Sequence, residues 1–245
     1  MNKSSFDGAR LFARIAHELA ATNDLPTTTG RVVQLAKSVL ECDSAAVWSL
    51  TSADTIKLHG ATDPVLAEHF SSMLAEVRQG MAWECLRSHT TIRVDDIRTD
   101  PRWPRYRAAV LRSADPFLSA VGYSLGDGDK HLGALIVASR QPAFFTDDLV
   151  ETGAIFAQHA AIGLDAVSAE EKVRNLQTAL TSNRRIGMAI GIVMNECRLQ
   201  DEQAFQMLRA ASQHTHRKLR DVAEEVILTG ALPSWPSRHL QPNSA

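Results

Sequence analysis

The stretch between Pro142 and Pro233 contains no proline, and this constrains the fold of the 245-residue chain more than any other feature. A helix can begin at Thr146, because two aspartates follow it near the positive end of the helix dipole. Apolar residues then recur every seven positions over about three heptads, which is typical of helices that pair. They are Ile155, Ile162, Ala169 and Leu176 at one heptad position and Ala166, Val173 and Leu180 at the other. We predict a long, coiled-coil-like helix over residues 147–181 that pairs two chains in a homodimer; packing of this helix onto its own domain is the alternative.

The sequence before this helix alternates between the spacing of helices and that of strands. Helical patterns cover about residues 6–20, 26–40, 63–78, 81–87 and 104–112. Strand patterns cover residues 44–50, 55–60, 90–94, 117–125 and 131–139, and short polar segments join the first two and the last two as hairpins. This order predicts an α+β fold with one antiparallel sheet and helices on its faces.

The sequence after the long helix predicts three short helices. The first runs from about Asn183 to Cys197, the second begins near Asp201, and the third runs from near His216 to Gly230. Two glycines inside the first of these helices lie four residues apart. Glycine weakens a helix, so the pair suits a backbone that another molecule approaches closely.

Composition excludes several classes of protein. Apolar residues make up 44% and charged residues 22% of the chain, which is close to a globular protein and far from a disordered one. No apolar run approaches the roughly 20 residues of a membrane span, and Asp7 and Arg10 interrupt the place of a signal peptide. Three cysteines without a CxxC pair argue against a disulfide framework and a zinc ribbon. We expect a cytoplasmic protein that does not contact a membrane.

Common enzyme motifs are absent, among them GxSxG, the P-loop, HExxH and GxGxxG. Cys42 and Cys85 leave open a reactive thiol or a redox site in the sheet domain, although free cysteines are more often buried apolar residues. We expect no enzymatic activity, no cofactor and no metal. Five aromatic residues are candidates for the walls of a ligand pocket, although core packing explains them equally well: Trp48, Trp83, Trp103, Tyr106 and Tyr123.

Positive charge gathers at two places in the C-terminal helices. The chain up to residue 167 holds 16 basic and 20 acidic residues, whereas the remainder holds 10 and 8. Arg184 and Arg185 open the first predicted helix, and a basic run at residues 217–220 opens the third. Arginine and lysine suit phosphates, and arginine, asparagine and glutamine suit base edges. The clusters favour a nucleic-acid-binding surface; a solvated charged face is the alternative.

Three motifs in residues 180–233 resemble an ANTAR domain, a small three-helix RNA-binding module of bacterial transcription antiterminators. They are SNRRIGMAIGIVM, DEQAFQMLRAASQ and RKLRDVAEEVILTGALP, in that order. Residues from about 10 to 167 resemble a GAF domain, a sensory module for small molecules. This resemblance rests on SAAVWSL, SAVGYSLGDGDKHLGALIVAS and FFTDDLVETGAIFAQHAAIGL. The order of the two domains resembles an actinobacterial class of regulator.

The resemblance implies a GAF domain at residues 1–146, a connecting helix at 147–181, an ANTAR domain at 182–233 and a flexible tail at 234–245. ANTAR domains bind RNA as dimers and hold paired stem-loops so that a terminator hairpin cannot form. The GAF domain would bind an unknown small molecule or serve to pair chains. By position, the implied RNA-facing residues are Arg184, Arg185, Ala189, Gly191, Ser212, Gln213, Arg217, Lys218 and Arg220. Ile190 stands where many family members have a lysine.

Two other functions remain open from the sequence. The helices at about 201–215 and 217–229 are close enough in sequence to form a helix-turn-helix, which would make the protein a DNA-binding regulator with a ligand-sensing GAF domain. A reactive thiol would instead make it an enzyme. Regulation by aspartyl phosphorylation is not expected, because the resemblance implies a GAF domain where many relatives have a receiver domain.

Overall fold

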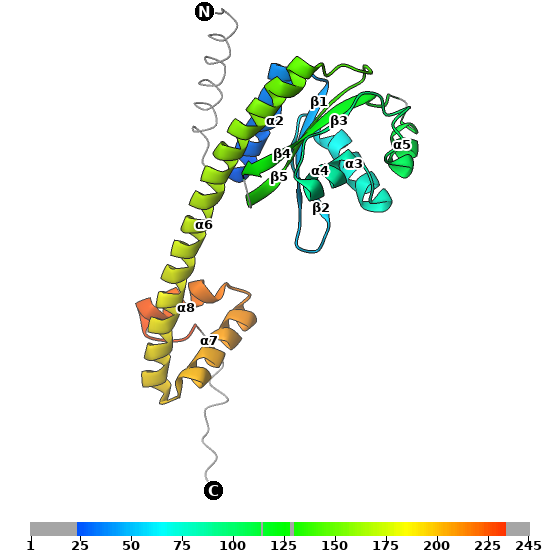
Figure 1. Ribbon diagram of the computed structural model, residues 1–245. Coiled ribbons are helices and arrows are strands. Elements are labelled where there is room, and N and C mark those ends of the chain that lie inside the picture. The colour runs from blue at the N-terminus through cyan, green and yellow to red at the C-terminus, as the bar shows by residue number, and fades with distance from the viewer. Residues whose placement is uncertain (1–23, 114, 128–129, 234–245) are drawn as a thin grey trace, which may run out of the picture. The chain divides into compact units, whose positions relative to one another are not determined.

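The computed structural model describes residues 24–113, 115–127 and 130–233 (Figure 1). The chain divides into two compact units, residues 1–171 and residues 172–245. The first predicted helix and the predicted C-terminal tail lie outside the described residues. None of the described helices is long and apolar enough to cross a membrane.

A five-stranded antiparallel sheet forms the centre of the first unit (Figure 1). Its strands are β1 (Ser44–Leu50), β2 (Ile56–Ala61), β3 (Ile92–Val94), β4 (Ser119–Asp127) and β5 (Lys130–Ser139). They lie in the order β2-β1-β5-β4-β3, and every neighbouring pair is antiparallel. Both predicted hairpins, β1–β2 and β4–β5, are therefore confirmed.

Helices cover both faces of the sheet, as the α+β pattern predicts. One face packs against α2 (Leu25–Leu40) and the first part of α6 (Asp147–Cys197). The other packs against α3 (Pro64–Val77), α4 (Met81–Ser88) and α5 (Pro104–Val110). Proline occupies the first turn of α2, α3 and α5, where its missing N–H leaves no helical hydrogen bond unmade.

Alternate residues of the three central strands, β1, β5 and β4, contribute to two separate hydrophobic cores. In β4, Val121, Tyr123 and Leu125 belong to the core beneath α2 and α6. Ala120 packs against the core beneath α3, α4 and α5. Gly153 of α6 lies directly against Tyr123, because an added Cβ would overlap the tyrosine ring and its hydroxyl. Glycine at this position therefore allows α6 to approach the sheet closely.

The helix predicted from Asn183 to Cys197 is not a separate element. It is the end of α6, which runs without a break over 51 residues. Thr181, Ser182 and Asn183 are weak helix formers, but each costs only a few tenths of a kcal/mol, about an order less than proline. The long helix thus extends beyond residue 181, where the sequence analysis placed a domain boundary.

One face of α6 is buried and another is apolar but exposed. Phe156 and Leu164 pack into the core of the first unit. The residues of the predicted heptad seam do not: Ile162 is 65%, Leu176 64% and Leu180 69% exposed. The other four seam residues are exposed as well. Packing of α6 onto its own domain therefore accounts for the first face but leaves the seam uncovered.

The second unit packs the end of α6 against α7 (Asp201–Thr215) and α8 (Leu219–Thr229). The third predicted helix begins later than expected. His216 has a left-handed backbone, with φ 52°, and ends α7, while Lys218 is the N-cap of α8. The prediction that α8 begins near His216 is therefore wrong, because residues 216–218 form the turn.

Candidate functional site

The turn between α7 and α8 fixes the backbone of the second basic cluster. The Ser212 hydroxyl donates a hydrogen bond to the carbonyl oxygen of Arg217 at 2.6 Å. The Arg217 N–H donates in return to the carbonyl oxygen of Ser212 at 3.1 Å. Since a serine hydroxyl has one proton, Ser212 has none left to donate to a ligand. Its role here is to position Arg217.

Four arginines from α6, from α8 and from the turn before α8 line one groove of about 700 Å³ in the second unit. Arg174 and Arg185 come from α6, and Arg217 and Arg220 come from the turn and the start of α8. The other lining side chains are polar or acidic. Arg174 was not among the predicted site residues, although its spacing of eleven residues from Arg185 equals about three helical turns and so places both on one face. A groove with this lining suits an anionic chain such as a nucleic-acid backbone.

Each predicted arginine of this groove contacts a carboxylate of α8. The ion pairs are Arg185–Glu224, Arg217–Glu225 and Arg220–Asp221. The arginine side chains keep 41–54% of their surface exposed. Ion pairs as exposed as these contribute only about 0.2–1 kcal/mol each. A phosphate group can therefore displace the carboxylates at small cost.

The basic residues at the start of α8 oppose the dipole of that helix. Cations near a helix N-terminus are destabilising, whereas anions are stabilising. Arg217, Lys218 and Arg220 are all exposed there, and Asp221 in the first turn offsets part of their charge. These cations thus do not serve helix stability. Together with the unpaired N–H groups of the first turn, they make this end of α8 attractive to phosphate.

Other predicted site residues lie outside the groove. Arg184 and Gly191 are exposed and, being seven residues apart, share a different face of α6. An added Cβ at Gly191 would meet nothing within 4 Å, so packing within the chain does not require glycine there. Gln213 and Lys218 are exposed, and their side chains make no hydrogen bond within the described part of the chain.

Ala189 does not belong to this surface, and its prediction as an RNA-facing residue is wrong. Its side chain is fully buried in the core that α6 forms with α7 and α8. Ala189 and Val193 are four residues apart and therefore turn toward the same core. Ile190 is partly buried against this core, so its side chain contributes to packing.

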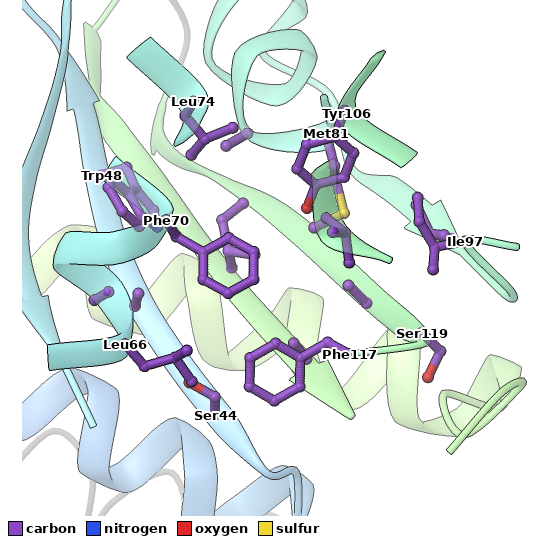
Figure 2. A pocket seen from close by; sticks show the side chains of 18 of the residues that line it. Ser44, Trp48, Leu66, Phe70, Leu74, Met81, Ile97, Tyr106, Phe117 and Ser119 are labelled. Carbon is purple, nitrogen blue, oxygen red and sulfur yellow. The ribbon is translucent and has the colours of Figure 1, made fainter. Parts of the chain in front are cut away.

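The first unit contains a cavity of about 70 Å³ between the sheet and α3, α4 and α5 (Figure 2). The rings of Trp48, Phe70, Tyr106 and Phe117 line it, together with aliphatic side chains. Trp48 and Tyr106 were candidates from the sequence, whereas Phe70 and Phe117 were not. The other aromatic candidates do not line this cavity: Trp83, Trp103 and Tyr123.

Cys42 and Cys85 do not form a joint site. Cys42 lies in the core beneath α2 and α6, and Cys85 lies in the core on the opposite face of the sheet. Burial raises the pKa of the Cys42 thiol to about 11 and that of the Cys85 thiol to about 12. Both thiols are therefore protonated at neutral pH, and a thiol is a poor nucleophile. Within the described ranges, no three His, Cys, Asp or Glu side chains are grouped to hold a metal ion.

Comparisons with known proteins agree with this division of the chain. A family model for the GAF domain matches residues 24–164, and one for the ANTAR domain matches residues 174–227. The GAF domain of a phosphoenolpyruvate-protein phosphotransferase from Acinetobacter superposes with a TM-score of 0.52 at 14% identity, covering 69% of this chain and 97% of that one. The corresponding domain from Coxiella burnetii gives 0.54 at 14% identity, with 68% and 98% covered.

An enzyme also shares the fold of the first unit. Free methionine-R-sulfoxide reductase from Neisseria meningitidis, in complex with its substrate, gives a TM-score of 0.52 at 14% identity and covers 71% of this chain and 95% of its own. At such identities the likeness extends to the fold alone. No curated protein sequence matches this chain.

Fold and site together define a sensory-type α+β domain joined to a helical unit with a basic groove. The chain belongs to the GAF domain family, and its C-terminal unit carries an ANTAR domain. Both are regulatory rather than catalytic domains. An ANTAR domain implies RNA-binding regulation by antitermination, and a GAF domain implies a sensory module.

Proposed function

We propose that this protein binds paired RNA stem-loops as a homodimer and thereby prevents a terminator hairpin from forming. The observation that supports this best is the groove in which Arg185, Arg217 and Arg220 converge with Arg174. The first three were expected to face RNA from separate motifs of the sequence. Two arginines of α6 and two that lie at least 32 positions later in the chain gather around one groove of a size and charge suited to a phosphate backbone.

The groove and the neighbouring turn between α7 and α8 have different roles in the proposed RNA binding. The arginines contact phosphates, which sets the position and orientation of the RNA. Gln213 and Lys218 lie exposed at the neighbouring turn with unengaged side chains, within the part of the chain that the structure describes. Sequence-specific recognition of RNA uses unstacked bases in loops. We assign Gln213 and Lys218 to contacts with such a loop and Ser212 to the positioning of Arg217.

The exposed seam of α6 supports pairing with a second copy of the chain. It carries Ile162, Val173, Leu176 and Leu180, whose side chains are all more than half exposed. The seven-residue spacing matches that of an identical helix, so a two-fold partner would cover these residues. Two linked RNA sites would then bind two stem-loops of one transcript with raised effective concentration. The GAF domain would act as sensor, and the place of action would be the cytoplasm.

The test is RNA binding by the full-length protein, measured by fluorescence anisotropy across a series of salt concentrations. The probes are a two-hairpin RNA, a one-hairpin RNA and duplex DNA, with the molecular mass measured in parallel. We expect a dimer that prefers the two-hairpin RNA. Arg217→Ala and Arg220→Ala should each weaken binding and lower the slope of log affinity against log salt by about 1.

Arg209→Ala is the matched control, because Arg209 is an exposed arginine of α7 outside the groove. Its substitution should leave the affinity nearly unchanged. Equal effects of all three substitutions would contradict the assignment of the groove. Preference for duplex DNA over both RNAs at matched salt would instead favour the helix-turn-helix alternative.

A further inference from the structure

We propose that the cavity beneath α3, α4 and α5 binds a small, neutral, mainly apolar molecule that accepts one hydrogen bond from the Tyr106 hydroxyl. This rests on the sensory role proposed for the GAF domain, and it specifies the chemistry of the ligand. The class extends from short-chain alcohols and ketones to single-ring molecules with one polar group.

The lining of the cavity selects against charge. Among the described residues that line it, none is acidic or basic. Two of its three hydroxyl side chains are engaged by the protein: Ser119 donates to the carbonyl oxygen of Gln141 at 2.6 Å, and Ser44 Oγ lies 3.4 Å from Thr62 Oγ1. A carboxylate or phosphate entering this space would lose its hydration without gaining a partner of opposite charge. Anionic nucleotides therefore do not fit the lining.

The Tyr106 hydroxyl is the third of these hydroxyl groups. It makes no hydrogen bond to any residue that the structure describes. Figure 2 shows its oxygen pointing into the space that the labelled side chains surround. Burial raises the pKa of Tyr106 to about 12, so the phenol is protonated at neutral pH and can donate. A ligand with one acceptor atom would satisfy this donor, which favours a polar group at one end of an apolar body.

The neighbours of Tyr106 hold its ring in place. Gly80 has a left-handed backbone, with φ 123°, and an added Cβ there would lie 2.7 Å from the tyrosine ring. The Trp103 ring packs edge-on against Tyr106 at 6.2 Å between centroids. Trp103 is itself fixed by a hydrogen bond from its Nε1 to Glu84 at 2.9 Å. The hydroxyl oxygen therefore has a fixed position at the cavity before any ligand binds.

The volume of the cavity limits the size of the ligand. A cavity of about 150 Å³ accepts benzene, and this one has about half that volume. Molecules with about three non-hydrogen atoms fit without change, whereas a single ring requires a wall residue to move. Phe117 is suited to move, because it is only partly buried and precedes β4. Its ring is tilted by 31° relative to that of Phe70, with 5.9 Å between the centroids.

The experiment uses ¹⁹F NMR on the full-length protein with four probes. 2-Fluoroethanol, which has four non-hydrogen atoms, tests the volume as it stands, and 4-fluorophenol, fluorobenzene and 4-fluorobenzoate are rings of similar size that differ in polarity and charge. We expect 2-fluoroethanol, 4-fluorophenol and fluorobenzene to bind in competition with one another, and 4-fluorobenzoate not to bind. Tyr106→Phe should weaken the binding of 4-fluorophenol about 2- to 12-fold, which corresponds to the loss of one hydrogen bond. The affinity for fluorobenzene should not change.

Ala120→Leu is a second variant, since Ala120 lines the cavity from β4 and leucine would fill part of it. It should abolish the binding of both neutral rings. Three results would overturn the proposal: no neutral probe binds, the benzoate binds as well as the phenol, or Tyr106→Phe weakens both rings equally. RNA binding is measured on the same preparations. Loss of RNA binding with retained probe binding refutes the proposed function and leaves the ligand assignment standing, and the reverse result refutes only the ligand assignment.

Discussion

If the arginines of the groove bind RNA as proposed, the carboxylates of α8 that contact them should reduce the affinity for RNA, and their removal should raise it. Glu224 pairs with Arg185, and Glu225 pairs with Arg217. The two glutamates are themselves 36% and 33% exposed, so each pair is screened by solvent. RNA phosphates that bind these arginines must compete with both carboxylates. The double substitution Glu224→Gln and Glu225→Gln removes the competitors and keeps the shape of the side chains.

The magnitude follows from the worth of exposed ion pairs. Each exposed ion pair contributes about 0.2–1 kcal/mol, so breaking both pairs makes the free energy of RNA binding about 0.4–2 kcal/mol less favourable. At about 1.4 kcal/mol per factor of ten, the double variant should bind a hairpin RNA about 2- to 30-fold more tightly. The gain should be largest at low salt, because salt screens the ion pairs and the phosphate contacts alike.

Fluorescence anisotropy with a labelled two-hairpin RNA measures this gain directly. Glu196→Gln is the matched control, since Glu196 is exposed on α6 and forms no ion pair with a described residue. It removes one negative charge from the same unit without releasing an arginine. Unchanged or weaker binding by the double variant, or an equal gain per charge with Glu196→Gln, would show that the carboxylates do not compete with RNA.

Two further predictions concern the folded state of the sensory domain and the long helix. Gly153→Ala should lower the free energy of unfolding by about 1–3 kcal/mol, because the new methyl group overlaps a buried tyrosine of β4. Urea denaturation measures this change. The control is Gly187→Ala in the same helix, whose new methyl group meets open space and should raise the free energy of unfolding by up to about 1 kcal/mol. Cys42 and Cys85 should resist alkylation in the native protein at pH 8, since their raised pKa values keep them protonated, whereas the partly exposed Cys197 should react first. Mass spectrometry of the modified peptides measures the order of reaction. Faster modification of Cys42 or Cys85 than of Cys197 would contradict this prediction.

The sheet, its two hairpins and the helices around it are predictable from the sequence, because each depends on local spacing. Strand residues alternate with a period of two, and Asp24 and Asp63 cap helices whose first turns carry a proline. The start of α8 was misplaced because His216 adopts a left-handed backbone, which is uncommon for any residue other than glycine. No local pattern distinguishes that residue from a helical one.

The residues that make up the site were harder to predict from the sequence than the helices and strands, because they are brought together only by tertiary packing. Arg184 and Arg185 are adjacent in sequence, but only Arg185 reaches the groove, because neighbours on a helix point about 100° apart. Ala189 was predicted to lie on the surface because of its place in a motif, but its side chain is buried against α7 and α8. The cavity was not predictable either, since its walls come from strands and helices that are distant in sequence.

The continuity of α6 restricts how the two domains can be recombined. Because no loop separates the sensory domain from the RNA-binding domain, one inserted residue turns everything that follows by about 100° and moves it by 1.5 Å along the axis. Seven inserted residues almost restore the original angle, since they complete nearly two turns. Chimaeras that carry another sensory domain should therefore keep their regulated activity only when the helix between the domains has particular lengths. Activity plotted against the number of inserted residues should rise and fall with the pitch of the helix.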